Sequence, residues 1–180
     1  MKRRLLIVGV VASLRALTLA GTAQAQSASG AVMRPQVGCA PAGCWPVYSF
    51  GDQDTDVYAI QYFLLDRKVA AFSSPTGYFG SLTQQSVERF QKAEGIPVSG
   101  VVGARTWPKL IVPVKYGQTN DAVRVLQTEL SQQYDYNIPV TGYYGNITRS
   151  DVADFQKKHG LKVNGSSVGA VTWHSIISTR

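Results

Sequence analysis

Two stretches of this chain carry the same helical pattern of apolar residues, sixty-six positions apart. The segments VYAIQYFL and VRVLQTEL each place apolar side chains at positions i, i+3 and i+7, which is one face of an amphipathic helix. These positions are Val57, Ile60 and Leu64 in the first segment and Val123, Leu126 and Leu130 in the second. We therefore predict two equivalent helices, one through each segment.

A second helix follows in each copy, after the nearly identical turns TGYFG and TGYYG. The segments SLTQQSVERFQKAEG and NITRSDVADFQKKHG again have apolar residues three positions apart. Ser81 and Asn146 are predicted as N-cap residues, because their side chains can accept hydrogen bonds from the free amides of a helix start. Gly95 and Gly160 are predicted to end these helices in the left-handed conformation.

A short third helix is predicted at the end of each copy. The segments IPVSGVVGARTWPKL and LKVNGSSVGAVTWHSI each contain a short extended stretch, a turn before a glycine, and a tryptophan. Pro108 is tolerated only in the first turn of a helix, so the first of these helices should begin near Thr106. Trp107 and Trp173 are predicted to fill the cores.

The repeat covers most of the chain. Residues 51–110 line up with residues 117–176, and an internal repeat determines the architecture. The pattern predicts an all-α fold of two tandem three-helix bundles of about sixty residues each, a size at which a single core is marginal but workable. We place the first module at residues 47–112 and the second at residues 113–180. The short connection IVPVKY should keep the two modules close together.

The start of the chain has the composition of a signal peptide. A basic start and an apolar run far shorter than the ~20 residues of a membrane span precede the small-residue site AQA. We predict a signal peptide at residues 1–25, a linker at residues 26–46, and a secreted protein without a membrane span. Cys39 and Cys44 are predicted to close a small disulfide loop in the linker, because close cysteine pairs in exported proteins are oxidised. A redox-active pair is the alternative, although such pairs normally have the tighter C-x-x-C spacing.

Charge is moderate once the predicted signal peptide is set aside. The formal net charge of +7 falls to +3 when the four basic residues of that segment are removed. The remaining basic residues are interspersed with acidic ones. Nucleic-acid binding is therefore not predicted, since it requires a clustered basic face, whereas a mildly basic protein suits an anionic polymer surface.

The repeated blocks resemble the peptidoglycan-binding domain family, whose members occur as accessory modules on bacterial cell-wall hydrolases. The second copy carries the resemblance through VKYGQTNDAVRVLQTEL, TGYYGNITRSDVADFQKKHGLKVNG and VGAVTWHSI, and the first through VYAIQYFL, TGYFGSLTQQSVERFQKAEGIPVSG and VGARTWPKL. The resemblance covers residues 47–178 and implies three-helix bundles, peptidoglycan as the partner, and a location in the periplasm or cell wall. The family often has aspartate in two turns where this chain has Thr76, Thr141, Ser99 and Asn164. These residues keep turn chemistry but remove four carboxylates, which would alter any ligand contact that used them.

Recognition of a glycan with peptide stems requires exposed aromatic rings, amide side chains and basic groups. The candidate ligand-binding residues are Tyr78, Gln91, Arg105, Thr106, Tyr143, Gln156 and Thr172. One aromatic residue of each TGY turn should pack inward, and we predict that Phe79 and Tyr144 do so while Tyr78 and Tyr143 stay exposed. For the two glutamines, a structural role as hydrogen-bonding groups at a helix cap or the edge of the core is the alternative.

Catalysis is not predicted from the inventory of reactive residues. A zinc hydrolase needs three protein ligands, usually with histidine prominent, but the chain has only His159 and His174. Both cysteines precede the repeats, and the paired carboxylates of one copy do not recur in the other, so neither a thiol nor a two-carboxylate mechanism is indicated. We predict a non-catalytic protein without metal or cofactor that attaches to peptidoglycan through two tandem modules. The alternatives are a cell-wall hydrolase, a subunit that targets a partner hydrolase, and a protein-interaction scaffold that has lost glycan binding.

Overall fold

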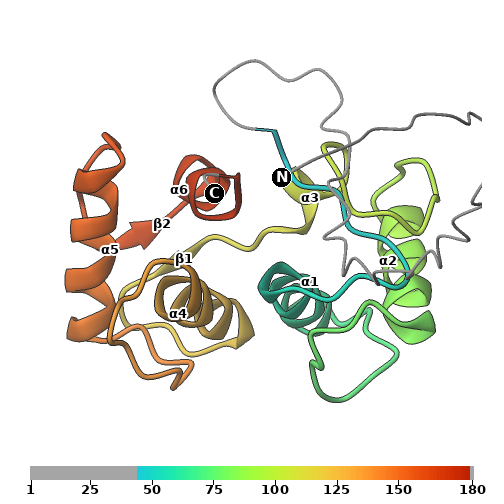
Figure 1. The fold of residues 1–180 in the computed structure, drawn as a ribbon, viewed down its shortest axis with the longest axis horizontal. Coiled ribbons are helices and arrows are strands. Elements are labelled where there is room, and N and C mark those ends of the chain that lie inside the picture. Colours follow the sequence, from blue (N-terminus) through green and yellow to red (C-terminus); the bar gives the residue numbers. More distant parts are fainter. Residues whose placement is uncertain (1–43, 179–180) are drawn as a thin grey trace, which may run out of the picture. The chain divides into compact units, whose positions relative to one another are not determined.

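The computed structural model describes residues 44–178, which form six helices and two short strands (Figure 1). In chain order these are α1 (Thr55–Asp66), α2 (Ser81–Ala93), α3 (Trp107–Leu110), β1 (Val114–Lys115), α4 (Asp121–Gln133), α5 (Asn146–Lys158), β2 (Ser167–Val168) and α6 (Ala170–Ser178). Three helices belong to each copy of the repeat, which confirms the predicted all-α fold of two three-helix modules. The predicted signal peptide, and Cys39 of the predicted Cys39–Cys44 disulfide, lie outside the described residues.

Each module has a core built on the predicted helical stripes. The three apolar positions predicted in α1, and the three in α4, have no exposed surface. Trp107 and Trp173 are the largest side chains that are fully buried, as predicted. Phe79 and Tyr144, from the turns before α2 and α5, are also fully buried. An aromatic side chain of this kind removes about 150–250 Å² from water, so these rings are major contributors to the stability of both modules.

The second helix of each module begins one position earlier than predicted. Gly80 and Gly145 are the N-cap residues and make no side-chain cap, so the prediction of Ser81 and Asn146 as N-caps is wrong. The ring of a nearby tyrosine explains the glycines, because a Cβ atom at these two positions would stand 3.3 and 3.0 Å from it. A serine or asparagine at the N-cap would displace that ring.

Four helices are followed by a residue in the left-handed conformation, and the sequence predicted this for two of them. Gly95 and Gly160 follow α2 and α5 with φ values of +65° and +64°, the left-handed conformation that was predicted for them and that glycine adopts readily. Lys68 and Asp135 adopt the same conformation after α1 and α4, with φ values of 61° and 56°. The first helices therefore end without a glycine signal.

A short antiparallel contact lies at the edge of each module. β1 pairs with β2, with Val114 opposite Val168, and Tyr48 pairs with Val102 at the equivalent place in the first module. The segment IVPVKY, predicted as a connection, therefore also contributes β1 to the second module.

Each core tryptophan is tied to the beginning of its own module. The indole Nε1 of Trp107 donates a hydrogen bond to the carbonyl oxygen of Pro46 at 2.8 Å, and Nε1 of Trp173 donates to that of Val112 at 2.9 Å. A buried indole N–H needs such a partner. The bonds place residues 46 and 112 at equivalent positions of the repeat.

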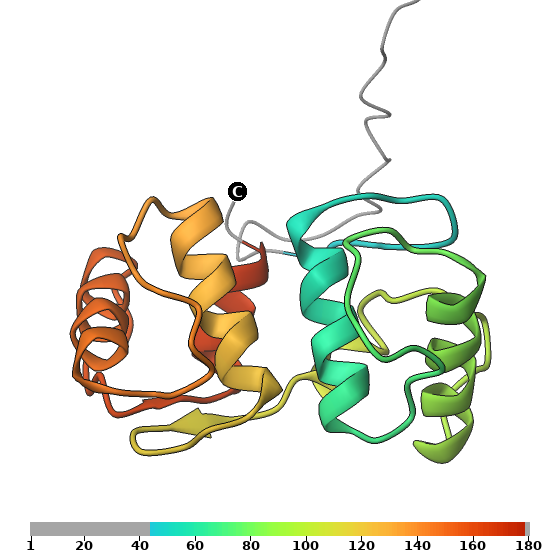
Figure 2. The same cartoon turned by 90° about the horizontal axis from the view of Figure 1, so that it is seen from below.

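The two modules are in contact through aromatic side chains. Helix α1 packs against α4, and the two helices lie side by side in Figures 1 and 2. The ring of Phe63 in α1 meets the ring of Trp173 in α6 edge to face, with 5.2 Å between centroids. Trp45 stacks on Trp107 at 5.8 Å and meets His174 of α6 at 4.6 Å. The modules are therefore joined by side-chain packing in addition to the connecting chain.

Candidate functional site

Residues 76–80 and 141–145, here called the aromatic turns, lead into α2 and α5. In each turn the fourth residue exchanges backbone hydrogen bonds of 2.8 to 2.9 Å with the segment ahead of the module's first helix. The second residue, Gly77 or Gly142, has a φ of +72° or +79°, a conformation strained for other residues. The glycines are thus required by the backbone, and the turns are fixed to the scaffold.

A buried glutamine of the first helix holds each aromatic turn. Oε1 of Gln61 accepts hydrogen bonds from two successive amides of the turn, at 2.7 and 2.9 Å. Its Nε2 donates to the carbonyl oxygen of Tyr78 at 3.0 Å and to Oγ1 of Thr83 at 2.9 Å. Gln127 repeats this arrangement in the second module, except that its Oε1 accepts from one amide of the turn, that of Gly142, at 2.8 Å. Buried and fully bonded amides of this kind specify one conformation, so both turns have a fixed shape.

The two aromatic residues of each turn point in opposite directions, as predicted. Tyr78 and Tyr143 are 44% and 48% exposed, whereas Phe79 and Tyr144 have no exposed surface. The hydroxyl of Tyr144 donates to the carbonyl oxygen of Gly165 at 2.8 Å, and burial raises the pKa of this phenol. Each turn therefore contributes one ring to the core and presents one at the surface.

A shallow hollow lies beside each exposed tyrosine. Its volume is about 210 Å³ in the first module and about 200 Å³ in the second. The same seven positions of the repeat line both hollows. The matched pairs are Gln61 and Gln127, Thr76 and Thr141, Tyr78 and Tyr143, Gly80 and Gly145, Ser81 and Asn146, Leu82 and Ile147, and Thr83 and Thr148. The fold therefore builds one cavity twice.

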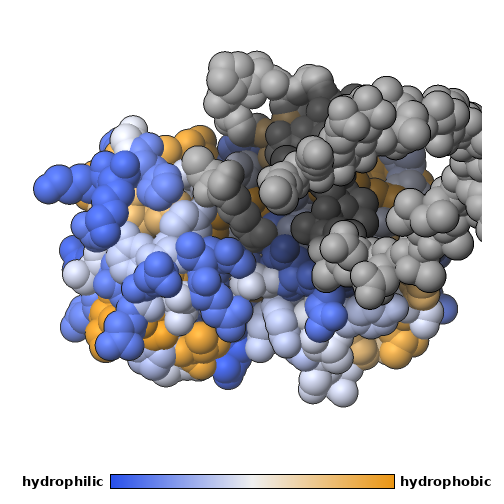
Figure 3. All heavy atoms as spheres, viewed as in Figure 1, coloured by the Kyte–Doolittle hydropathy of each residue, from blue (hydrophilic) through white to orange (hydrophobic). Residues whose placement is uncertain are grey.

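The lining of the hollows is mainly apolar. Leu82 and Ile147 are 51% and 57% exposed, and Phe72 or Ile138 adds an apolar side chain from the loop after the first helix. Figure 3 shows hydrophobic atoms at the surface over these loops, at the lower right and lower left of the view. Cavities for drug-sized ligands measure roughly 300–1,000 Å³, so each hollow suits one sugar ring or one small side chain of a larger ligand.

The other predicted site residues lie elsewhere. Gln91 and Gln156 are only 1% exposed, and each accepts two amide hydrogen bonds from the turn before the third helix. Their Nε2 atoms donate to Oγ1 of Thr106 at 3.0 Å and of Thr172 at 3.4 Å. These four side chains lie inside the modules, which favours the structural alternative for the two glutamines. Arg105 is exposed but lines neither hollow.

The sequence analysis missed Leu82 and Ile147. The available signal was an apolar residue at the second position of both α2 and α5, outside the predicted buried stripe. An apolar side chain repeated at an exposed position is typical of a contact surface.

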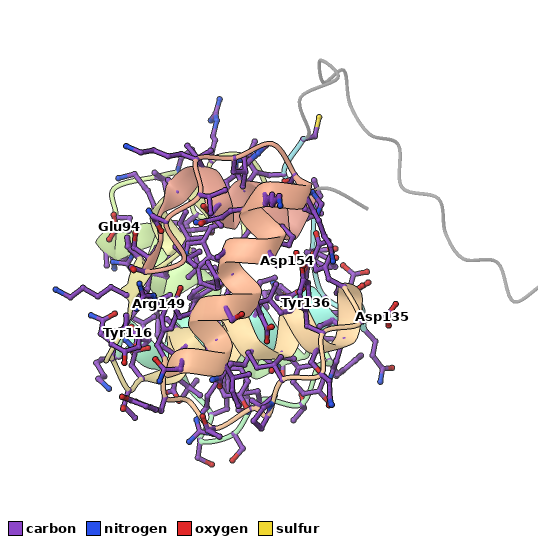
Figure 4. All side chains as sticks on the ribbon, turned by 90° about the vertical axis from the view of Figure 1, so that its left-hand side faces the viewer. Glu94, Tyr116, Asp135, Tyr136, Arg149 and Asp154 are labelled. Atoms are coloured by element: carbon purple, nitrogen blue, oxygen red, sulfur yellow. The ribbon has the colours of Figure 1, made fainter. Side chains whose placement is uncertain are left out.

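A charged cluster lies on the opposite side of α5 from Arg149, as Figure 4 shows. The hydroxyl of Tyr136 donates to Oδ2 of Asp154 at 2.8 Å, and Nζ of Lys158 lies 2.7 Å from the same oxygen. Burial and the bond to Asp154 raise the pKa of Tyr136 to about 12, while the hydrogen bonds from Lys158 and Tyr136 lower the pKa of Asp154. The cluster ties the loop after α4 to α5.

Residues 44–178 contain neither a candidate metal site nor a membrane-spanning helix. No group of three or more His, Cys, Asp or Glu side chains in this part of the chain is arranged to hold a metal ion. No helix there is long and apolar enough to cross a membrane.

Comparison with known proteins identifies the class to which these modules belong. The model of the family described as "Putative peptidoglycan binding domain" matches residues 53–110 and again residues 119–175, together more than half of the chain. The chain belongs to this family, and the membership indicates binding to peptidoglycan. It is also 32% identical over 99 residues to a protein of Kitasatospora aureofaciens described as "Uncharacterized protein in bpoA1 3'region", an alignment that covers 55% of this chain and 84% of that protein.

Proposed function

We propose that this protein attaches to bacterial peptidoglycan without cleaving it, through the hollow beside the aromatic turn of each module. The observation that carries the proposal is the repetition of one cavity, lined by the same seven positions, in both modules. Membership of the family supports peptidoglycan as the ligand. The predicted signal peptide, with a secreted, periplasmic or wall-bound location, agrees with such a ligand.

The chemistry of the hollows suits a glycan with peptide stems. The exposed ring of Tyr78 or Tyr143 offers a flat apolar face for a sugar ring or a methyl group, and its hydroxyl remains available for a polar contact. Leu82 or Ile147 adds further apolar surface to the lining of the hollow. Two weak sites on a polymer with many equivalent positions gain affinity through effective concentration, which gives the duplication a use.

Co-sedimentation of the mature protein with insoluble peptidoglycan tests the proposal. We expect Tyr78→Ala and Tyr143→Ala each to weaken retention, by about fivefold or more, because each removes an aromatic contact of about 1 kcal/mol or more. The double variant should lose most of the retention, since neither module then offers its ring.

Matched controls separate the hollows from general surface effects. Val98 and Val163 are exposed by 56% and 51% and line neither hollow, so Val98→Ala and Val163→Ala should retain wild-type binding. Equal retention of the tyrosine and valine variants would contradict the role of the hollows. The same protein on a gel with embedded peptidoglycan should produce no zone of clearing, and clearing would support the alternative of a wall hydrolase.

A further inference from the structure

The two hollows share seven lining positions, but the modules differ at two positions outside that lining, here called the rim. The position just ahead of the first module's Gly51 is Phe50, and its counterpart in the second module is Tyr116. Both are exposed, by 59% and 43%. One helical turn into the second helix, the first module has Gln84 where the second has Arg149. The second module therefore has a hydroxyl and a cation where the first has neither.

The second module connects these groups to its hollow. The hydroxyl of Tyr116 donates to Oδ1 of Asn146 at 3.1 Å, and Asn146 lines the hollow. The guanidinium carbon of Arg149 lies over the ring of Tyr116, 5.5 Å from its centroid. Figure 4 shows Arg149 and Tyr116 together on one side of α5. A guanidinium placed over an aromatic ring is held in position by a cation–π interaction and keeps its N–H groups as donors.

The charge of Arg149 is not neutralised by an ion pair among the described residues. The ion pairs there join Lys109 with Glu94, Arg124 with Asp121, and Lys158 with Asp154. Glu94, which is labelled near Arg149 in Figure 4, belongs to the end of α2 in the first module. An exposed arginine in this situation is a ready partner for a carboxylate, which it binds with two parallel hydrogen bonds.

The first module has the opposite character at the same place. Nε2 of Gln84 donates to Oε1 of Glu88 at 3.1 Å, and the counterpart of Glu88 in the second module is Ala153. A carboxylate on a ligand would thus approach an acidic side chain in the first module and a basic one in the second. Salt weakens such charge interactions at a protein surface.

A second difference between the modules also gives the second module more positive charge. A Cβ atom on Gly142 would stand 3.0 Å from Nε of Arg124, whereas the equivalent Gly77 is covered by the ring of Tyr58. Nε of Arg124 forms an ion pair with Asp121 at 3.7 Å. Arg124 therefore contributes less uncompensated positive charge than Arg149. Both differences, Arg149 in place of Gln84 and Arg124 in place of Tyr58, nevertheless make the surroundings of the second aromatic turn more basic than those of the first.

We propose that the second module takes a carboxylate-bearing part of the peptide stems of peptidoglycan, with Arg149 as the residue that binds the carboxylate, whereas the first module takes an uncharged part. This inference rests on the proposed function. The shared lining binds the group that both sites have in common, and the rims select what is attached to it. The two modules are therefore distinct in specificity, and binding by the second is the more sensitive to salt.

Two preparations of one polymer test the inference. Native peptidoglycan sacculi are compared with sacculi whose carboxylates have been converted to amides by carbodiimide and ammonia. The experiment uses mature protein carrying Tyr78→Ala, so that the second module dominates retention. We expect Arg149→Gln to weaken binding to native sacculi about two- to tenfold, the range for an exposed charge-assisted contact, and to leave binding to amidated sacculi unchanged. Arg149→Lys should retain part of the difference, because it keeps the charge without the planar donor pair.

Controls in the same assay isolate the position of the charge. Lys157→Gln removes one exposed positive charge from the same helix and should leave the ratio of native to amidated binding as it is in the parent protein. The pair Gln84→Arg and Glu88→Ala gives the first module the side chains that the second has at these two helix positions. Combined with Tyr143→Ala, it should make retention by the first module dependent on carboxylates.

The outcomes distinguish this inference from the proposed function. If the parent protein binds both preparations and Arg149→Gln leaves their ratio unchanged, the inference is overturned while the proposed function stands. If the wild-type protein binds neither preparation, both are overturned. Circular dichroism of each variant shows that the fold is intact, so that a loss of binding reports on the rim.

Discussion

At the scale of single residues, four buried glutamine side chains repeat one role, which is to hold a turn through hydrogen bonds to its backbone. Gln61 and Gln127 hold the aromatic turns, and Gln91 and Gln156 hold the turns before the third helices. In each case one amide side chain bonds to both an amide and a carbonyl of a turn distant in sequence. The side chain thereby replaces the backbone partners that a tight turn cannot supply.

Replacing one of these amides should destabilise the protein. In Gln91→Leu, the amides of residues 99 and 100, the carbonyl of Val101 and the hydroxyl of Thr106 lose a buried partner. An unsatisfied buried polar group costs about 1–3 kcal/mol, so we expect a loss of at least about 2 kcal/mol in a urea titration. Gln85→Leu, at an exposed position of the same helix, should change stability by less than about 0.5 kcal/mol. Equal losses for the two variants would argue against the role assigned to Gln91.

At the residue scale, the sequence predicted burial better than polar function. The burial of Phe79, Tyr144 and the core tryptophans was predicted correctly. Large aromatic side chains that recur at the same position of a repeat usually pack in the core. The sequence left the role of Gln91 and Gln156 open, since the partner of an amide depends on where a distant turn returns to the helix. The N-cap predictions were wrong, and the tight fit of a neighbouring tyrosine ring against the glycines at these positions is not visible in the sequence.

At the scale of elements, the contact between α1 and α4 brings two acidic side chains into interaction. Asp66 ends α1 and Asp121 begins α4. Burial is the main cause that raises the pKa of the Asp66 carboxyl, and the charge of Asp121 raises it further. A carboxyl whose pKa is higher in the folded state than in the unfolded chain stabilises the fold only while it is protonated.

The pH dependence of stability tests this helix contact. The stabilising contribution of Asp66 is fully present below 3.8, the ordinary pKa of an aspartate, and is lost as the pH rises through the higher pKa of the folded state. We therefore expect Asp66→Asn to be more stable than the wild type at pH 7, by less than about 1 kcal/mol since the site is partly solvated. The advantage should shrink as the pH falls through the higher pKa of the folded state and disappear below the ordinary aspartate pKa.

Asp135→Asn serves as the control because it changes an exposed aspartate away from this contact. Chemical denaturation at several pH values gives both curves. An advantage of Asp66→Asn that did not change with pH would contradict the assignment.

Helix ends were predictable from the sequence where a glycine marks them, whereas the pairing of the short strands was not. Gly95 and Gly160 identified the ends of α2 and α5, but Lys68 and Asp135 have no property in the sequence that announces a left-handed conformation. The strands β1 and β2 have two residues each, too few to show an alternating pattern. Their pairing became visible only in three dimensions.

At the scale of the whole molecule, the aromatic contacts between modules join two cores. Ala59 and Phe63 are buried beside the predicted stripe of α1, so this helix has apolar surface on more than one side. The sequence contained that signal, but it did not reveal that the partner is α4 and the ring of Trp173.

Removing the ring of Phe63 should affect both modules. We expect Phe63→Ala to lower stability by about 3–5 kcal/mol, the usual cost of truncating a buried phenylalanine, and to increase amide hydrogen exchange in α6 as well as in α1. Phe90→Ala truncates a buried ring in α2 and serves as the control. At matched global stability, faster exchange in α6 should be specific to Phe63→Ala. Protection of α6 that was the same in both variants would show that the contact between the modules carries little energy.

The indole hydrogen bonds of Trp107 and Trp173 also determine where a portable module must be cut. The family match starts at residues 53 and 119, but the carbonyl partners of the two indoles lie at Pro46 and Val112. A fusion tag trimmed to the matched ranges would strand a buried N–H group, at a cost of about 1–3 kcal/mol, in a domain that has little stability to lose. A stand-alone module made from either half of the repeat should therefore begin upstream of those carbonyls.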